Sequence, residues 1–339
     1  MPIRERVVVR IFTNYVVPDI SALLGMRKTL LDANVELHLN KSGPADLVLV
    51  LNANKSLRWV FAPRNRFYKF LQEPVVRSPL THLFTYRHPR FFSRIYTHSP
   101  NPSNPREIKS HGFLGSELVG DTELSESLPS KTKLVSVVAS TIAILPGHKK
   151  RLGFVERLIS QLPHLENDLY GRGRKKELTR KIDGLRDYMF SIAIENTAAP
   201  SYITEKFTDC IRAGVVPLYF GASDVGDYFP EGSFIRLPLE NEKECFQIIG
   251  DLSAEDYESR RQAILDAQRI IESSFSLGKF INATASEILK QPIQSRRALV
   301  CLFGLDGILL RLSDALGFAS SFIPGSIKKR LSGILYPKL

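Results

Sequence analysis

The sequence is poor in cysteine, methionine and tryptophan, and it lacks long hydrophobic runs. Its 339 residues include three cysteines, three methionines and one tryptophan. An odd number of cysteines without a CxxC pair does not suit a disulfide scaffold and favours a reducing compartment. No window of about 18 uncharged apolar residues occurs, and the amino terminus lacks the apolar core of a signal peptide. We therefore expect a cytoplasmic protein without a membrane-spanning helix.

Motifs that define several common enzyme classes are also missing. The chain has no Walker A motif, no GxGxxG and no GxSxG, which argues against ATPases, NAD-dependent enzymes and serine hydrolases. It also has no HxH, HExxH or Asp-x-Asp pair, so the sequence predicts no metal site. Asp-x-Asp is the carboxylate pair with which one class of sugar transferases holds a divalent ion on a diphosphate. We expect no required cofactor, and at most stimulation by Mn²⁺ or Mg²⁺.

Positive charge is in excess. Lysine and arginine number 46 against 35 aspartates and glutamates, which gives a net charge of +11. Such a balance attracts nucleic acid, anionic lipid or phosphorylated sugars. No helix-turn-helix, zinc-finger or RNP pattern accompanies the charge, so nucleic acid is not the expected partner. Residues 290–339 carry eight basic residues against two acidic ones and predict a basic, amphipathic tail.

Short apolar runs alternate with stretches of helical spacing, which predicts α/β domains with parallel sheets. The predicted strands are 7–13, 35–39, 46–51, 68–71, 134–139, 168–170, 188–194 and 215–220. The predicted helices are 20–33, 151–162, 241–250 and 255–273, with one more that begins after Thr204. A Pro- and Gly-rich loop and a polar stretch place a boundary near residue 130. We predict domains at 1–130 and 131–290, followed by a helical tail at 291–339.

The most informative segment is 190–221, FSIAIENTAAPSYITEKFTDCIRAGVVPLYFG. A buried strand runs into a loop with Glu195 and Asn196, and Thr204 can cap a helix that starts with Glu205 and Lys206. Ligands of open α/β sheets bind outside the carboxyl ends of the strands, and helix amides with a lysine suit a diphosphate. Spacing alone leaves a plainer alternative open, in which Thr204 and Glu205 only cap the helix and Lys206 is solvated.

The order ENT, YITEK and GVVPLYFG within this segment resembles the signature of the α1,3-fucosyltransferase family, glycosyltransferase family 10, in its bacterial type. The resemblance implies a GT-B-like fold, with two Rossmann-like, doubly wound domains that face a cleft. It implies inverting transfer of fucose from GDP-fucose to a glycan hydroxyl, with an α1,3-type linkage. The acceptor would be an oligosaccharide or glycolipid, in polysaccharide or lipopolysaccharide synthesis or in protein glycosylation.

The same resemblance assigns roles to particular residues. Arg151, which opens the RLGF motif, would contact the pyrophosphate, and Tyr202 and Glu205 would hold the sugar. The implied donor-binding residues are Arg151, Tyr170, Arg172, Glu195, Asn196, Tyr202, Thr204, Glu205 and Lys206. In the N-terminal half, Glu73 in FLQEP is the candidate catalytic residue, because inverting transfer needs one base for the acceptor hydroxyl.

Two other function classes remain open from the sequence. One is a transferase of the same family with a different nucleotide-deoxysugar donor, since the pocket residues do not name the sugar. The other is a non-catalytic binding module for anionic glycan or nucleic acid. The tail likewise has two interpretations: its apolar first part, 298–319, would pack as a helix on the N-terminal domain, and 327–339 would contact an anionic membrane, peripherally at its inner surface.

Overall fold

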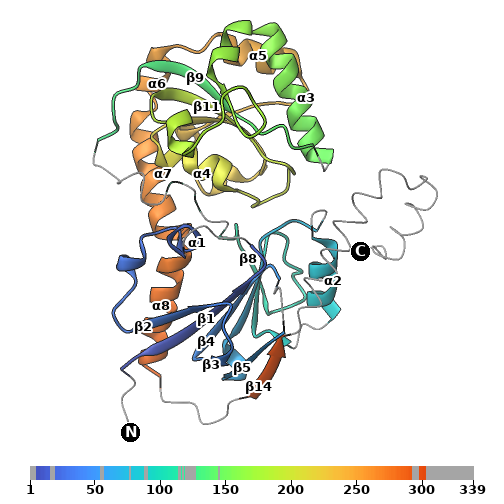
Figure 1. The fold of residues 1–339 in the computed structure, drawn as a ribbon, viewed down its shortest axis with the longest axis vertical. Helices are drawn as coiled ribbons and strands as arrows, with labels where there is room; N and C mark the ends of the chain where they lie inside the picture. The colour runs from blue at the N-terminus through green and yellow to red at the C-terminus, as the bar shows by residue number, and fades with distance from the viewer. Residues whose placement is uncertain are drawn as a thin grey trace, which may run out of the picture. The chain divides into compact units, whose positions relative to one another are not determined.

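The computed structural model describes residues 5–15, 20–53, 57–75, 78–87, 91–113, 116, 118, 127–143, 146–291 and 298–302. These residues form two packing units, whose elements are labelled in Figure 1. Unit 1 takes its described residues from 1–16, 31–112 and 281–339, and unit 2 takes them from 17–30 and 113–280. The sequence predicted three consecutive segments, whereas the two units are interleaved along the chain.

Unit 1 is built on a six-stranded parallel sheet with the order β2-β1-β4-β6-β7-β8. Its strands are β1 (Val7–Thr13), β2 (Val35–Leu39), β4 (Leu47–Leu51), β6 (Phe67–Leu71), β7 (Arg94–Thr97) and β8 (Glu107–Lys109). Ile11 of β1 pairs with Leu39 on one side and with Leu49 on the other. Strand β4 is buried along its whole length, which explains its uninterrupted apolar sequence. The four strands predicted in this unit lie within one residue of their observed bounds.

A second, smaller sheet in unit 1 changes the interpretation of the tail. Its order is β14-β5-β3, from β14 (Ala298–Leu302), β5 (Arg58–Ala62) and β3 (Gly43–Pro44). The predicted helix from 298 to 319 is wrong in its first five residues, because their backbone pairs antiparallel with β5. Residues 303–339 lie outside the described part, so the rest of the tail prediction is untested. The helices of unit 1 are α2 (Pro79–Arg87) and the larger part of α8 (Leu277–Leu289), with a 3₁₀ turn at Arg64–Arg66.

Unit 2 is built on a five-stranded parallel sheet with the order β10-β9-β11-β12-β13. Its strands are β9 (Lys133–Val138), β10 (Leu169–Tyr170), β11 (Tyr188–Ile194), β12 (Val216–Phe220) and β13 (Ile235–Arg236). Its helices are α1 (Ile20–Leu24), α3 (Pro146–Gln161), α4 (Glu205–Arg212), α5 (Glu242–Gly250), α6 (Ala254–Glu258) and α7 (Arg261–Ser274). Its 3₁₀ turns are Lys28–Leu30, Pro163–Asp168, Lys181–Gly184, Val225–Asp227 and Glu231–Ser233.

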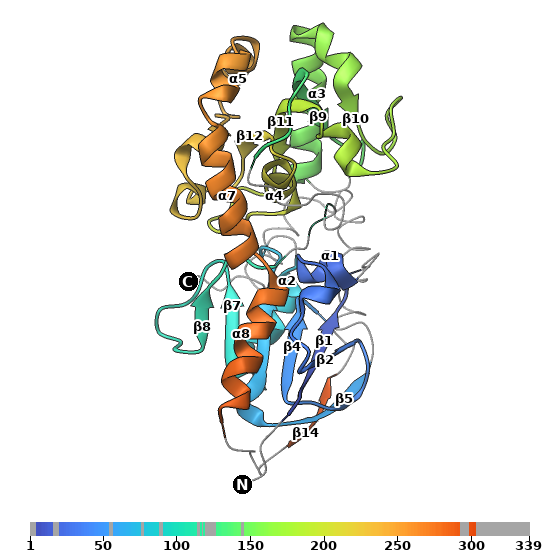
Figure 2. The same cartoon turned by 90° about the vertical axis from the view of Figure 1, so that its left-hand side faces the viewer.

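The side chains of β11 alternate between two hydrophobic cores, as expected for a strand covered on both faces. Phe190, Ile192 and Ile194 pack in a core with α3 and α5. Ala193 packs in the other core with α4 and α7. Figure 2 shows strands of unit 2 between α3 and α7. The sheet is therefore doubly wound, as predicted.

The predicted helix 20–33 is the clearest helical error. The chain is helical only over α1, and Lys28–Leu30 forms a separate 3₁₀ turn. Gly25 follows α1 with a φ of +66°, a left-handed conformation that ends a helix. Apolar spacing alone extended the prediction through this glycine. Among the described helices none has the length and apolar character needed to cross a membrane.

Both large sheets share a strand order that fixes where ligands can bind. In unit 1, β2 lies at the edge beside β1, and β4 lies on the other side of β1. In unit 2, β10 lies at the edge beside β9, and β11 lies on the other side of β9. Successive connections therefore run in opposite directions from the first strand and leave a crevice at the carboxyl ends. The crevice lies between β9 and β11 in unit 2 and between β1 and β4 in unit 1.

Two of the three cysteines are buried in unit 2. Burial raises the pKa of Cys210 to about 12 and that of Cys245 to about 11. Because the thiolate is the reactive form, only about one thiol in a thousand or fewer is reactive near pH 8. In a Cys301→Ser background we expect no reaction of the native protein with Ellman's reagent on the minute timescale. The same sample in guanidinium should release two equivalents, and rapid native release would contradict the described burial.

Candidate functional site

A cavity of about 560 Å³ opens at the crevice between β9 and β11 in unit 2. Ala139 and Ser140 follow β9, Gly171 and Arg172 follow β10, and Asn196 follows β11. Helix α3 adds Arg151, the first turn of α4 adds Glu205 and Lys206, and residues 177–179 and 181 also line the cavity. Strand ends and helix starts thus meet at the position predicted for a ligand in this type of sheet.

Two glycines allow the backbone to close around the cavity. Gly171 has a φ of +141°, and a Cβ there would lie 2.5 Å from the carbonyl oxygen of Ala139. A Cβ on Gly147, at the start of α3, would lie 1.7 Å from the carbonyl oxygen of Asn196. Any larger residue at either position would force the strand ends and the helix apart. The two glycines therefore set the width of the pocket wall.

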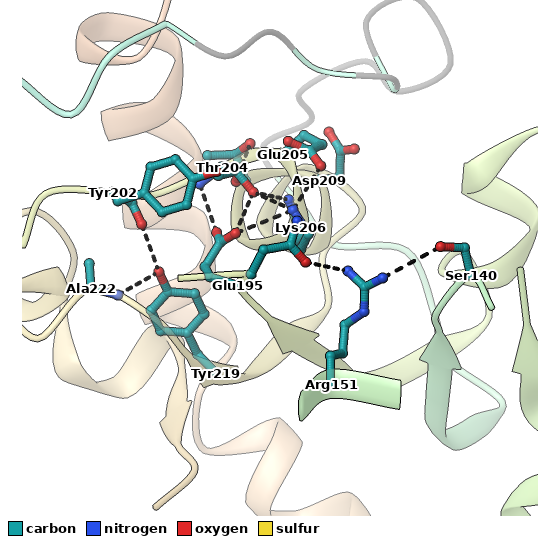
Figure 3. Close-up of polar contacts among 12 residues, drawn as sticks. Ser140, Arg151, Glu195, Tyr202, Thr204, Glu205, Lys206, Asp209, Tyr219 and Ala222 are labelled. Carbon is teal, nitrogen blue, oxygen red and sulfur yellow. Dashed lines mark hydrogen bonds and ion pairs between the residues drawn. The ribbon is translucent and has the colours of Figure 1, made fainter. Parts of the chain in front are cut away.

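Glu195 organises the start of α4 from behind the pocket. Its side chain has 0% exposure, and its carboxylate accepts hydrogen bonds from the Thr204 backbone N–H and hydroxyl, both at 2.8 Å. The Lys206 ammonium lies 3.3 Å from the same carboxylate (Figure 3). Burial raises the pKa of Glu195, while Lys206 and Thr204 act in the opposite direction. Glu195 therefore holds the helix start and the ammonium group in place and does not line the cavity.

Lys206 is the cation that the sequence placed at the pocket, and its ammonium is held by three oxygen atoms. Besides Glu195 it contacts the Thr204 hydroxyl at 3.0 Å and the Glu205 carboxylate at 3.1 Å. Burial alone would lower the pKa of Lys206, but Glu195 and Glu205 outweigh it and raise the pKa. The lysine remains protonated and its side chain is 21% exposed, so it can meet an anion in the cavity.

Glu205 is kept ionised by two lysines. Burial alone would raise the pKa of its carboxyl group, but Lys206 and Lys181 lower it to about 2. Lys181 lines the cavity and bonds at 2.8 Å to Asp209, whose side chain is fully buried. Sequence reasoning missed Lys181, because it stands in a polar stretch rich in basic residues where nothing in the local pattern distinguishes it.

Arg151 faces the pocket from α3 with part of its bonding capacity unused. It donates to Asn196 Oδ1 at 2.7 Å. It also donates to Ser140 Oγ at 3.4 Å, as Figure 3 shows. Within the described part of the chain its buried Nε has no hydrogen-bond partner, and neither does the buried Nη2 of Arg174. Burial lowers the pKa of Arg151, and the positive charge of Arg174 lowers it further. The negative charges of Glu195 and Glu205 act in the opposite direction and raise this pKa. Two neighbouring guanidinium groups with unused donors form a receptor for an anion. Arg174 was also missed by the sequence analysis.

The predicted donor-binding residues therefore fall into two groups. Arg151, Arg172, Asn196, Glu205 and Lys206 line the cavity. Four others are not among its lining residues: Tyr170, Glu195, Tyr202 and Thr204.

Two of these four contribute aromatic rings that are packed into the protein. The Tyr170 hydroxyl bonds to that of Tyr188 at 2.7 Å, and Tyr188 donates to Asp168 at 2.6 Å. Tyr202 is 3% exposed, and its carbonyl accepts a hydrogen bond from the Tyr219 hydroxyl. In this arrangement both tyrosines support the pocket wall, and a direct contact with a donor stays a prediction.

The candidate base lies at the corresponding edge of unit 1. Glu73 follows β6 and is 7% exposed, and the Tyr15 hydroxyl donates to its carboxylate at 3.4 Å. The Nε2–H of His82 donates to the Glu73 carbonyl oxygen at 2.8 Å, which fixes the local backbone. Asn52 follows β4 with a φ of +60°, and its buried Oδ1 has no hydrogen-bond partner among the residues that the structure describes. Polar groups therefore collect at the carboxyl ends of β1, β4 and β6.

Neither unit offers a ready metal site within the described residues. No group of three or more histidine, cysteine, aspartate or glutamate side chains there is arranged to hold a metal ion. The cations that face the pocket are instead Arg151, Arg172, Lys181 and Lys206. Metal-independent chemistry remains a prediction.

The comparisons with known proteins agree with this architecture. Two solved structures of α1,3-fucosyltransferase, one with GDP-fucose and one described without it, match 85% of this chain with TM-scores of 0.51 and 0.53. The matches cover 92% and 91% of those chains at 17% sequence identity. The fold is therefore that of the two-unit, GT-B-type glycosyltransferases.

Sequence comparisons point to one family within this class. Residues 128–259 match the model "Glycosyltransferase family 10 (fucosyltransferase) C-term". This part of the chain is therefore similar to the C-terminal domain of that family, and it contains the residues that line the pocket. The Alpha-(1,4)-fucosyltransferase of Arabidopsis thaliana is 54% identical over 48 residues, which are 14% of this chain and 12% of that protein. Human GDP-fucose protein O-fucosyltransferase 3 is 28% identical over 213 residues, 58% of this chain and 40% of that protein. The chain spans less than half the length of these two relatives.

Proposed function

We propose that this protein is an inverting fucosyltransferase that uses GDP-fucose as its donor. The observation that carries the proposal is the pocket of unit 2. Arg151 and Lys206 both line this pocket, which lies at the carboxyl ends of β9 and β11 and beside the starts of two helices. A nucleoside diphosphate is the ligand class that matches paired cations and helix amides. The family match and the names of the relatives support fucose as the transferred sugar.

In the proposed reaction, unit 2 holds the donor and its leaving group. Arg151 and Lys206 neutralise the two phosphates, and Arg174 supplies a further unused N–H toward the same region. The bond between C1 of fucose and the phosphate oxygen breaks, and its electron pair leaves with GDP. Glu205, ionised because of Lys206 and Lys181, is suited to accept hydrogen bonds from sugar hydroxyls. Preorganised cations at a leaving group act mainly on the transition state.

Unit 1 would supply the acceptor side. Glu73 accepts the proton of an acceptor hydroxyl as that oxygen attacks C1, and a single displacement inverts the configuration there. Tyr15 and His82 hold the Glu73 side chain and backbone. The acceptor we propose is an oligosaccharide or glycolipid hydroxyl with an α1,3-type linkage. The name of the human relative adds a protein hydroxyl as a second acceptor class. An anionic membrane surface remains a proposed partner of residues 327–339.

A donor and acceptor array with detection of released GDP tests the proposal. We expect nucleotide release from GDP-fucose only when a suitable acceptor is present, and a product with inverted configuration at C1. GDP-mannose and UDP-sugars serve as donor controls. If nucleotide is released from another nucleotide-deoxysugar and not from GDP-fucose, that sugar nucleotide would replace GDP-fucose as the assigned donor. Tight, steeply salt-dependent binding of glycan without turnover under any donor would support a binding module instead.

Loss of the Arg151 guanidinium should weaken phosphate recognition specifically. We expect Arg151→Ala to weaken GDP binding by about 10- to 100-fold, since charged hydrogen bonds contribute about 1.5–3 kcal/mol. Guanosine, which lacks phosphates, should bind wild type and variant alike. Isothermal titration calorimetry with GDP, GMP and guanosine measures the difference. Equal loss of affinity for all three ligands would show that the variant has lost the pocket rather than a phosphate contact.

A further inference from the structure

The small sheet of unit 1 exposes a continuous apolar face. Side chains of β5 alternate, with Val60 and Ala62 buried in the core of unit 1. The exposed side chains are Leu57, Trp59, Phe61 and Leu299, at 61%, 50%, 42% and 66% exposure. Leu299 of β14 pairs directly with Phe61 of β5, so the two side chains lie on the same face of the antiparallel pair. We call these four residues the Trp59 face; Figure 1 shows the two strands that carry it.

Such a face is unusual for a strand pair in water. Single exposed apolar residues are common, whereas two aromatic and two aliphatic side chains on adjacent strands mark a binding surface. The backbone beneath the face is ordered by its own bonds: β14 pairs with β5 over five residues, and the Trp59 N–H donates to Ser42 Oγ at 3.2 Å. The exposure is therefore a property of a formed sheet and not of a loose loop.

The described charges on and next to the strands of the small sheet have one sign. Among the described residues of β3, β5 and β14 none is acidic, while Arg58 belongs to β5 and exposed Lys41 lies two residues before β3. A second copy of this chain would bring like charges together, with +11 on each copy.

We propose that the Trp59 face binds an anionic lipid surface. Tryptophan and phenylalanine rings are favoured at the boundary between headgroups and acyl chains. Apolar burial and attraction to anionic headgroups act together in reversible surface binding, and this face combines both. The proposal concerns a folded surface of unit 1, is independent of the proposed transferase activity, and would orient that unit at a membrane.

Trp59 is the only tryptophan of the chain, so its fluorescence reports on the face directly. The full-length protein is titrated with vesicles of phosphatidylcholine alone, or of phosphatidylcholine with phosphatidylglycerol. We expect a blue shift of the Trp59 emission with anionic vesicles and quenching by lipids brominated near the headgroup. Partition should fall at least about tenfold in Phe61→Ser/Leu299→Ser, which removes two apolar side chains from the contact. It should fall by a similar factor in Lys41→Glu.

Leu30→Ser is the matched control, because Leu30 is 53% exposed and belongs to unit 2, whereas the Trp59 face belongs to unit 1. This variant should bind vesicles like the wild type. Vesicle binding without a Trp59 shift would place the contact in another segment and overturn the proposal. A blue-shifted Trp59 emission without lipid would also overturn the proposal. If the shift is independent of protein concentration, a segment of the same chain covers the face. If the shift depends on protein concentration, a second copy of the chain covers it. Binding of an acidic protein, without binding of anionic vesicles, would likewise overturn the proposal.

Discussion

Replacing Lys206 with methionine is expected to lower kcat of fucosyl transfer by about 10²–10³-fold, because the departing diphosphate loses a preorganised cation. Its ammonium is fixed between Glu195, Glu205 and Thr204 and is held protonated by the two carboxylates. Steady-state release of GDP at saturating acceptor measures the effect. Lys243→Met, at an exposed position of α5, is the matched control and should retain full activity.

The same substitution should also destabilise the fold, which allows the two effects to be separated. Without Lys206 the buried Glu195 carboxylate loses its cation, and removing one partner of a buried pair costs about 3 kcal/mol. In Lys206→Met/Glu195→Gln that buried charge is absent, so denaturant unfolding should show recovered stability. Activity should remain as low as in the single variant. Recovered activity in the double variant would mean that Lys206 serves only to neutralise Glu195.

Glu73→Gln is expected to lower kcat by about 10²–10⁴-fold, the usual contribution of a positioned general base. The physical reason is that a glutamine side chain cannot accept the proton of the acceptor hydroxyl. Steady-state release of GDP at saturating donor and acceptor measures the effect.

A matched control for this prediction is Glu287→Gln, which removes an exposed carboxylate of α8 in the same unit. It should keep the wild-type rate. GDP binding should be unchanged in Glu73→Gln, since the donor pocket belongs to unit 2. A Glu73→Gln enzyme with wild-type rates at every pH would reject the base assignment.

Part of the donor pocket could be predicted from the sequence because its residues are adjacent in the chain. One strand end and the following helix start place Asn196, Glu205 and Lys206 within a few residues of each other. The Thr204 cap was predicted from residue type alone, and its hydroxyl does accept the Lys206 backbone N–H. Sequence patterns were therefore enough to predict pocket residues where a strand, its loop and the next helix cap follow one another directly in the chain.

Other parts depend on contacts between distant segments. Lys181 and Arg174 reach the pocket region from turns with no distinctive pattern, and Ser140 becomes a partner of Arg151 only through the pairing of strands. The interleaving of the two units is also a tertiary effect: Arg212 donates to the Gly25 carbonyl across 187 residues of sequence, which ties the first helix to unit 2. Nothing local in residues 17–30 indicates this partner.

The central claim is that the pocket of unit 2 holds the two phosphates of a nucleotide, and a crystal structure with bound GDP tests it most directly. The account predicts the diphosphate within hydrogen-bond distance of Arg151 and Lys206, at the carboxyl ends of β9 and β11 and beside the start of α4. Clear density for GDP at another place, with this pocket containing only solvent, would contradict it.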